Sequence, residues 1–229
     1  MRVAFLVPAF NEVSTICDVL ERLDALALEF EVIVVDDGSS DGTAAAVDAW
    51  RNGREDIVLI SQPHRGKGAA IRTAISQMTA DIAVIQDADM EYDPIDVPAL
   101  IEPIVAGMAD VTFGSRLIGG RPQRAYLFWH LVGNRLLSLL TNILFNTTIS
   151  DMETGYKAFR AGVLRSLDLR RDDFGIEAEI TAKVCKRGFR VYQLPVAYYG
   201  RTYAEGKKIT WRDGVRAVGV LLKVRFRDR

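Results

Sequence analysis

The sequence lacks the features of a secreted or membrane-spanning chain. It contains two cysteines, Cys17 and Cys185, each in an apparently helical and partly apolar segment. This pattern is typical of free buried thiols and fits a reducing cytoplasm better than a disulfide framework. No apolar run approaches the roughly 18 to 20 residues that a spanning helix needs. The apolar start from Val3 to Phe10 is interrupted by Pro8 and has no small-residue cleavage site, so we expect no secretory signal.

An excess of charge of one sign is also missing. The formal net charge is −1 at pH 7, which gives no reason to expect a nucleic acid partner. The charge is nevertheless uneven, because eight basic and two acidic residues lie between Lys207 and Arg229. We find no internal repeat or low-complexity segment, and 49% of the residues are hydrophobic, which is ample for a sizeable core. We therefore expect one domain over residues 1–229.

Strand-like apolar runs alternate with helical patterns over the first half of the chain. The expected strands are Val3 to Val7, Glu31 to Val35, Ile57 to Ile60, Asp81 to Ile85 and Val111 to Phe113. The expected helices between them are about Ser14 to Leu28, Asp41 to Trp50, Gly68 to Met78 and Ile95 to Gly107. This alternation is typical of βαβ units and predicts an α/β fold with a mainly parallel central sheet. Ligands of such sheets bind beyond the carboxyl ends of the strands.

The second half has a different pattern, which begins with one long predicted helix from Tyr126 to Asn146. Its apolar stripe consists of Phe128, Val132, Leu136, Leu139, Leu140, Ile143 and Leu144, and its polar stripe of His130, Asn134, Ser138, Thr141 and Asn142. From this pattern we favour packing of the apolar stripe on the sheet, with a lipid surface as the alternative. A helix from Gly175 to Arg187, a strand from Arg190 to Leu194 and a basic helix from about Thr210 are expected to follow.

Acidic residues follow two of the predicted strands directly. Asp36 and Asp37 come after the second strand, and Asp87, Asp89 and Glu91 come after the fourth. Two aspartates that are one residue apart can both face one hard divalent cation where the chain turns. Aspartates also cap helices, so this cluster alone leaves a metal site and a helix cap open.

Basic residues near the same edge could meet a phosphate group. Lys67 lies between Gly66 and Gly68 at the start of a predicted helix, where free backbone N–H groups and the lysine charge would suit phosphate, although the Walker pattern is absent. Arg116 and the segment from Arg201 to Lys208 add further cations. Plain solvation is the alternative for any one of them.

Taken in order, five short motifs resemble the inverting glycosyltransferases of family 2. They are Val7-Pro8-Ala9-Phe10-Asn11-Glu12, Val34-Val35-Asp36-Asp37-Gly38-Ser39, Gly66-Lys67-Gly68, Asp87-Ala88-Asp89 and Gly114-Ser115-Arg116. The segments from Asp151 to Arg160 and from Arg201 to Lys208 are similar to those of the polyprenyl-phosphate (dolichyl-phosphate) sugar synthases. The resemblance implies a Rossmann-like nucleotide-diphospho-sugar transferase fold, called GT-A, with C-terminal amphipathic helices. Residues 1–120 would bind the nucleotide sugar, and residues 121–229 the acceptor.

The resemblance also implies roles for particular residues, carried over by position. The nucleoside would be held by Pro8, Phe10, Glu12, Val35 and Asp37. The rest of the nucleotide-sugar site would be formed by Lys67, Asp87, Ala88, Asp89, Arg116, Arg201 and Lys207. One Mg²⁺ or Mn²⁺ would be held by Asp87 and Asp89, with Glu91 either a third ligand or facing water, because many relatives have glutamine there.

Three residues are expected to take part in catalysis: Asp89, Arg116 and Asp151. Asp151 is the candidate general base, with a structural contact to Lys157 or a backbone turn as the alternative. A lipid phosphate acceptor is already an anion and needs no strong base, whereas a sugar hydroxyl would need one. The position of Asp151 therefore matters most if the acceptor is a hydroxyl.

The function implied by the resemblance is transfer of a monosaccharide from a UDP-glucose or GDP-mannose type donor to a polyprenyl phosphate. The segments from Gly66 to Ala70 and from Asp151 to Phe159 slightly favour UDP-glucose. The alternatives are a polysaccharide or other soluble hydroxyl acceptor and, more remotely, a non-catalytic nucleotide-binding module. The amphipathic helix and the basic C-terminal segment would place the protein peripherally at the inner, cytoplasmic face of the membrane.

Overall fold

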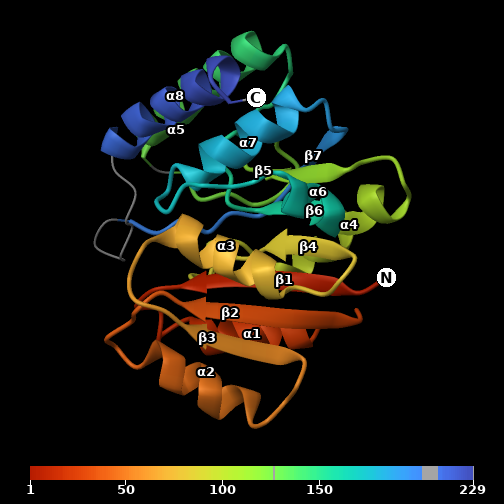
Figure 1. Ribbon diagram of the computed structural model, residues 1–229, viewed down its shortest axis with the longest axis vertical. Helices are drawn as coiled ribbons and strands as arrows, with labels where there is room; N and C mark the ends of the chain where they lie inside the picture. Colours follow the sequence, from red (N-terminus) through yellow and green to blue (C-terminus); the bar gives the residue numbers. More distant parts are fainter. Residues whose placement is uncertain (126, 203–210, 229) are drawn as a thin grey trace.

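A seven-stranded sheet forms the centre of the protein, whose computed structural model describes residues 1–125, 127–202 and 211–228. The strands are β1 (Val3–Ala9), β2 (Phe30–Asp36), β3 (Ile57–Ser61), β4 (Ile82–Ile85), β5 (Val111–Ser115), β6 (Lys157–Arg160) and β7 (Val191–Pro195). Their order across the sheet is β3-β2-β1-β4-β6-β5-β7 (Figure 1). Strand β6 is antiparallel to both of its neighbours, and the other pairs of strands are parallel, so the predicted α/β fold with a mainly parallel sheet is confirmed.

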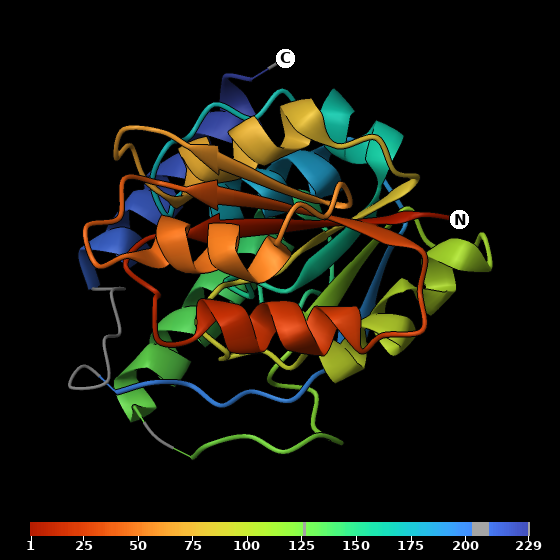
Figure 2. The same cartoon turned by 90° about the horizontal axis from the view of Figure 1, so that it is seen from below.

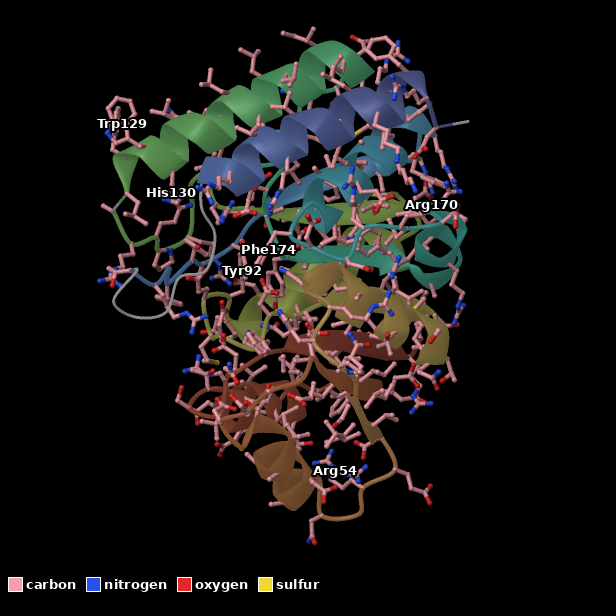
Figure 3. All side chains as sticks on the ribbon, turned by 60° about the vertical axis from the view of Figure 1, so that its left-hand side comes forward. Arg54, Tyr92, Trp129, His130, Arg170 and Phe174 are labelled. Carbon is pink, nitrogen blue, oxygen red and sulfur yellow. The ribbon has the colours of Figure 1, made fainter. Side chains whose placement is uncertain are left out.

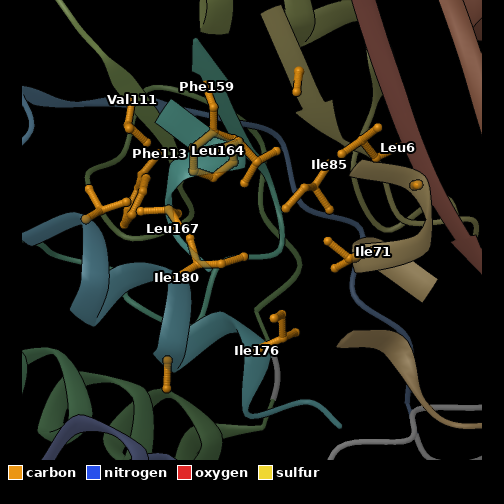
Figure 4. Packing of buried hydrophobic residues seen from close by; sticks show 14 of the residues in the cluster. Leu6, Ile71, Ile85, Val111, Phe113, Phe159, Leu164, Leu167, Ile176 and Ile180 are labelled. Carbon is orange, nitrogen blue, oxygen red and sulfur yellow. The ribbon is translucent and has the colours of Figure 1, made fainter. Parts of the chain in front are cut away.

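Helices cover both faces of the sheet (Figure 2). They are α1 (Ile16–Asp24), α2 (Thr43–Arg51), α3 (Lys67–Gln77), the 3-10 turn η1 (Pro94–Asp96), α4 (Val97–Val105), α5 (Phe128–Phe145), α6 (Ala161–Ser166), α7 (Ile176–Lys186) and α8 (Trp211–Phe226). One hydrophobic cluster joins the sheet to α3, α6, α7 and α8, and a second joins it to α1, α2 and α4. Successive side chains of β1 alternate between the two, since Phe5 belongs to the second cluster and Leu6 to the first (Figure 4).

The carboxyl ends of three neighbouring strands create the edge on which the site is built. Strand β1 lies between β2 and β4 and is parallel to both, with Leu6 opposite Ile33 on one side and Ile85 on the other. All three strands are apolar and buried on both faces, which is typical of parallel strands covered by helices. The loops that follow Ala9, Asp36 and Ile85 therefore start from one edge.

Strand β6 and helix α6 were not predicted. The four residues of β6 begin with Lys157 and end with Arg160, so the run lacks the β-branched composition of a buried strand. Lys157 is nevertheless fully buried, because Glu177 pairs with its charge. A buried cation with a partner distant in sequence gives no local signal, and the strand was missed for that reason.

Helix α5 buries residues of its polar stripe, whereas we expected its apolar stripe to be buried. It packs on α7 and α8, and its polar Ser138 and Thr141 are the buried residues. The polar stripe can be buried because loops supply its hydrogen bonds: Asn142 exchanges two with the backbone of Ile149 (2.8 and 3.0 Å). Apolar residues of the other stripe are exposed, namely Phe128, Leu136, Leu139 and Ile143. The expectation that the apolar stripe packs on the sheet is therefore wrong for these four residues, whereas Leu140 and Leu144 of the same stripe pack against the first hydrophobic cluster.

Helix α8 lies beside α5 at the outside of the molecule (Figure 1). Val220, Leu221 and Val224 bury one side of α8 in the first hydrophobic cluster, while Val215 and Phe226 are exposed. In the described part of the chain, no helix combines the length and the apolar character required to cross a membrane. Both cysteines are free and partly buried.

Candidate functional site

Asp37 organises the loop that faces the end of β2. Its side chain is 3% exposed and accepts hydrogen bonds from Gln62 Nε2 (2.6 Å) and from the backbone N–H groups of Arg65 (3.1 Å) and Gly66 (2.7 Å). The ring nitrogen Nδ1 of His64 lies 2.8 Å from its Oδ2. The carboxylate thus holds residues 62–66 in place, and its predicted contact with a nucleoside stays a prediction.

Phe10 supplies an aromatic surface next to this loop. Its ring stacks on that of His64, with 4.2 Å between the ring centroids. Pro8 lies on β1 opposite Val35 of β2. The side chain of Val35 is fully buried in the first hydrophobic cluster, so only its backbone can take the predicted part in nucleoside binding.

The glycines around Lys67 serve close packing. A Cβ atom at Gly66 or Gly68 would lie 2.5 Å or less from a backbone oxygen of the segment 171–172. The N–H of Gly66 donates to Asp37, and that of Ala69 donates to the carbonyl of Asp172. The protein itself therefore uses two of the N–H groups near the start of α3, and binding of a phosphate there stays a prediction.

Lys67 itself belongs to a buried charge network. Its Nζ lies 2.6 Å from Asp87 Oδ1 and 3.0 Å from Glu177 Oε1, and Lys157 Nζ lies 2.5 Å from Glu177 Oε2. Burial alone would lower the pKa of Lys67, but the charges of Asp87 and Glu177 outweigh it and raise that pKa above its ordinary value. Lys67 is therefore a fixed cation beside the first aspartate of the acidic motif.

Arg201 lies among the remaining acidic side chains. Its guanidinium contacts both carboxylate oxygens of Glu12 (3.0 and 3.1 Å) and Oδ2 of Asp89 (2.9 Å). Glu91 accepts hydrogen bonds from the backbone N–H of Arg201 (2.7 Å) and from the hydroxyl of Tyr198 (2.7 Å). Both carboxylate oxygens of Glu91 are therefore bonded to the protein, and whether this residue also binds a metal ion stays a prediction.

Asp89 is the most perturbed carboxyl group of this cluster. Burial raises its pKa first, and the negative charges of Asp87 and Glu91 raise it further, to about 7. The charge of Arg201 opposes this shift only in part. Ionisation of Asp89 is therefore unfavourable even beside Arg201, and a further cation would favour it.

Arg116 is held by Asp151 at the end of β5. Asp151 is fully buried and accepts from Arg116 Nε (2.7 Å), Nη2 (2.7 Å) and backbone N–H (2.9 Å), and from Asn134 Nδ2 of α5 (2.7 Å). Burial would raise the pKa of Asp151, but the charge of Arg116 lowers it below its ordinary value. The alternative that Lys157 is its partner is wrong. A buried, paired carboxylate with a lowered pKa suits positioning of Arg116 better than proton abstraction.

A cleft connects part of this charged cluster with α5. It has a volume of about 1220 Å³ and is lined by Lys67, Asp87, Glu91 and Arg116 at its inner end. Residues 123–125 and the first turns of α5 line its other end, where Figure 3 shows Trp129 pointing outward. Glu153 also lines the cleft, and burial followed by the charge of Glu177 raises its pKa to about 7.

The acidic motif has the side chains to bind a divalent cation whose remaining ligands are substrate phosphates. Asp87, Asp89 and Glu91 offer hard carboxylate oxygens, as Mg²⁺ and Mn²⁺ prefer. No group of three or more His, Cys, Asp or Glu side chains within the described ranges is arranged to hold a metal ion. Mg²⁺ is commonly bound by one or two carboxylates together with substrate phosphates. Asp87 and Asp89 could supply that smaller set if Lys67 and Arg201 gave way.

The structure brings together most of the predicted site, with two exceptions. Ala88 is buried in the second hydrophobic cluster, so its side chain cannot line the site. Lys207 lies outside the described residues. Glu177 and Glu153 were missed by sequence reasoning, because their partners lie in other segments. For Glu177, the only signal was an acidic residue in the first turn of a predicted helix.

Sequence comparisons with known proteins identify the family of this chain. Residues 4–168 match the sequence profile described as Glycosyl transferase family 2. The chain is 30% identical to Glycosyltransferase AglJ of Haloferax volcanii, over 98% of this chain and 71% of that protein. It is 28% identical to undecaprenyl-phosphate mannosyltransferase of Micrococcus luteus, over 90% and 87%.

A solved structure shares the fold. Glucosyl-3-phosphoglycerate synthase from Mycobacterium tuberculosis, in complex with Mn²⁺, uridine diphosphate and phosphoglyceric acid, superposes with a TM-score of 0.76 at 21% identity. The match covers 98% of this chain and 78% of that one. With the family profile matched over most of its length, this chain belongs to glycosyltransferase family 2 and has the GT-A fold.

Proposed function

We propose that this protein transfers a hexose, with inversion, from a nucleotide diphosphate sugar to a polyprenyl phosphate at a membrane surface. The observation that carries the proposal is a cleft that runs from Asp87 to the first turns of α5. Its inner end offers carboxylates and Arg116 to a metal-bound diphosphate, and its outer end opens beneath exposed Phe128 and Trp129. The relative from Micrococcus luteus, named as an undecaprenyl-phosphate mannosyltransferase, supports this acceptor class.

In this proposal the protein's side chains place positive charges beside the phosphate groups of the substrates. Arg116 is held by Asp151 in the orientation needed to meet a phosphate, and Lys67 stays charged beside Asp87. A divalent cation bound at Asp87 and Asp89 would offset negative charge on the leaving nucleoside diphosphate. An acceptor phosphate approaching along the cleft is already an anion and would attack the anomeric carbon without a strong base. Exposed apolar residues of α5 and the basic C-terminal segment would hold the protein peripherally at the inner face of the membrane.

A hydroxyl acceptor is a second candidate, and Glu153 favours it. This side chain lines the cleft, and its pKa of about 7 suits a general base at neutral pH. Transfer to a hydroxyl would then depend on Glu153, whereas transfer to a lipid phosphate would not. Glu153→Gln therefore separates the two reactions.

The test is a transfer assay on the purified protein with Mn²⁺ and radiolabelled UDP-glucose or GDP-mannose. Each donor is offered with undecaprenyl phosphate in detergent and, separately, with soluble sugar acceptors. We expect label in the organic phase, with UDP-glucose the better donor, and equal yield from Glu153→Gln. Label found only in soluble products, and lost in Glu153→Gln, would replace the lipid acceptor with a hydroxyl.

A further inference from the structure

Arg201 occupies the place among the carboxylates where a second cation would have to bind. Its Nη1 and Nη2 contact both oxygens of Glu12, and Nη2 also contacts Oδ2 of Asp89 at 2.9 Å. The other oxygen of Asp89, Oδ1, accepts the backbone N–H of Glu91 (3.0 Å). Both oxygens of Asp89 are therefore already used by the protein.

This pairing leaves part of the guanidinium unsatisfied. Nε of Arg201 is buried and has no hydrogen-bond partner among the described residues, and Oε1 of Glu91 lies 3.9 Å from it. Arg116 differs, because its Nε and Nη2 both donate to Asp151 at 2.7 Å. Removing a donor from water without a partner costs free energy. Arg201 is thus held by charge at a place that does not complete its hydrogen bonds.

A guanidinium and a divalent cation would compete for Asp89. A metal ion lies about 2.1 Å from a carboxylate oxygen, so a metal at Oδ2 would lie within roughly 5 Å of Nη2, and like charges at that separation repel strongly in a partly buried site. Arg201 also uses its charge to offset Glu12, which is buried. Release of Arg201 from Asp89 would make the carboxylate of Asp89 available to a metal ion. It would also make the guanidinium of Arg201 available to another anion.

We propose that Arg201 and the divalent cation exchange at Asp89. Arg201 holds the acidic cluster together before the metal binds, and the metal displaces its guanidinium. The released guanidinium then binds the diphosphate that enters together with the metal. This step rests on the proposed function. Arg201 is therefore a positioning residue that couples metal entry to donor binding.

The first test measures metal binding alone, by isothermal titration of Mn²⁺ into the full chain at about pH 8 without nucleotide or acceptor. Because a competing cation is removed, Arg201→Ala should bind Mn²⁺ about tenfold more tightly than the unaltered protein, within the usual range of coupled binding events. The control is Arg54→Ala, since Arg54 also pairs with two aspartates, Asp24 and Asp56, and lies far from Trp129 at the other end of the molecule (Figure 3). It should leave the Mn²⁺ affinity unchanged.

Several outcomes would overturn the exchange. Equal or weaker Mn²⁺ binding by Arg201→Ala would show that the arginine does not compete, and equal tightening in Arg54→Ala would show only a general charge effect. Absence of Mn²⁺ binding by every variant would show that a metal ion does not replace Arg201 at Asp89 without the diphosphate, and would overturn the exchange. If Arg201→Ala fails to fold, as judged by circular dichroism, Arg201→Gln takes its place in the titration.

The second test separates exchange from a purely structural role. With Mn²⁺ saturating, UDP should bind Arg201→Ala about tenfold more weakly, because the freed guanidinium no longer reaches the diphosphate. Exchange therefore predicts opposite changes in the affinities for Mn²⁺ and for UDP, whereas a structural defect would weaken both. Neither titration uses a sugar or a lipid, so failure to form lipid-linked product would leave this inference standing.

Discussion

Arg116 and Arg201 are held in different ways, although both were predicted from the sequence as phosphate-binding cations. Arg116 makes a forked pair with one buried carboxylate, whereas Arg201 is shared between Glu12 and Asp89. A single fully satisfied pair fixes geometry, and a shared cation leaves room for exchange. The ion pairs of these two arginines therefore decide which carboxylates a ligand can reach.

Asp89→Asn tests the role of the acidic motif in transfer. The amide keeps the size of the side chain and removes its charge, so metal-dependent stabilisation of the leaving group should be lost. We expect the transfer rate to fall by about a hundredfold or more, as when other preorganised charge-stabilising groups are removed. The measurement is product formation at saturating donor and Mn²⁺. Wild-type turnover would mean that Asp89 does not bind the metal.

The same variant has a predicted pH signature in the metal-free protein. Since the pKa of Asp89 is raised from 3.8 to about 7 in the folded state, that state holds the proton more tightly than the unfolded chain does. The contribution of Asp89 to the free energy of unfolding therefore falls as pH rises from about 4 to 7. Asp89→Asn should be more stable than the wild type at pH 8 and not at pH 4, in urea unfolding with EDTA. Equal differences at both values would contradict the raised pKa.

Asp151→Asn distinguishes a positioning residue from a general base. Removal of the negative charge leaves Arg116 without its ion pair, so we expect the free energy of unfolding to fall by about 3 kcal/mol and kcat to fall about tenfold. Asn134→Ala removes a neutral contact to the same carboxylate and should have a smaller effect. The pH profile of kcat should keep its shape in Asp151→Asn. Loss of its acidic limb would instead identify Asp151 as the base.

At the scale of elements, β6 and α5 show where local patterns mislead. Strand β6 is central in the sheet but only four residues long, with charged residues at both ends. Helix α5 has a clear stripe of apolar residues, yet its polar side faces the protein. In both cases residues outside the element supply the compensating charge or hydrogen bond: Glu177 for β6, and the backbone of Ile149 and Met152 for α5.

Asn142→Ala tests the orientation of α5. This side chain donates to the carbonyl of Ile149 (3.0 Å) and accepts from its N–H (2.8 Å), so its removal unpairs two partly buried backbone groups. The free energy of unfolding should fall by about 2 kcal/mol. Ile143→Ala on the exposed stripe of the same helix is the control and should change it by less than about 0.5 kcal/mol. The reverse order in urea unfolding would show that the apolar stripe is the one that packs.

At the scale of the whole molecule, acidic residues at the sheet edge and the exposed apolar residues Phe128 and Trp129 of α5 line one cleft. Trp129 and Ile143 of α5 are 78% and 71% exposed, and Phe226 of α8 is 73% exposed. Exposed apolar groups gathered on neighbouring helices mark a surface that contacts another phase or partner. In the proposed function that partner is an anionic lipid surface, which the basic C-terminal segment would attract.

Vesicle binding tests this surface in the full chain. The double variant Trp129→Ser and Ile143→Ser should partition onto vesicles containing phosphatidylglycerol about tenfold less than the wild type, because less apolar area is buried. Its melting temperature should not change, since both side chains are exposed. Ile95→Ser, which removes an exposed isoleucine from η1, is the matched control for co-sedimentation. Equal binding of all three proteins would exclude α5 as the lipid contact.

The sequence by itself determined the alternation of elements, the parallel sheet edge and the acidic motif, because each depends on residues adjacent along the chain. Asp87 and Asp89 follow a buried strand, and that order alone predicts their place at the ligand edge. Only the tertiary structure decided the partners: Arg201 for Asp89, Lys67 for Asp87 and Arg116 for Asp151. Electrostatic pairing acts through space over a few ångströms, between segments up to 112 residues apart, so sequence patterns carry no record of it.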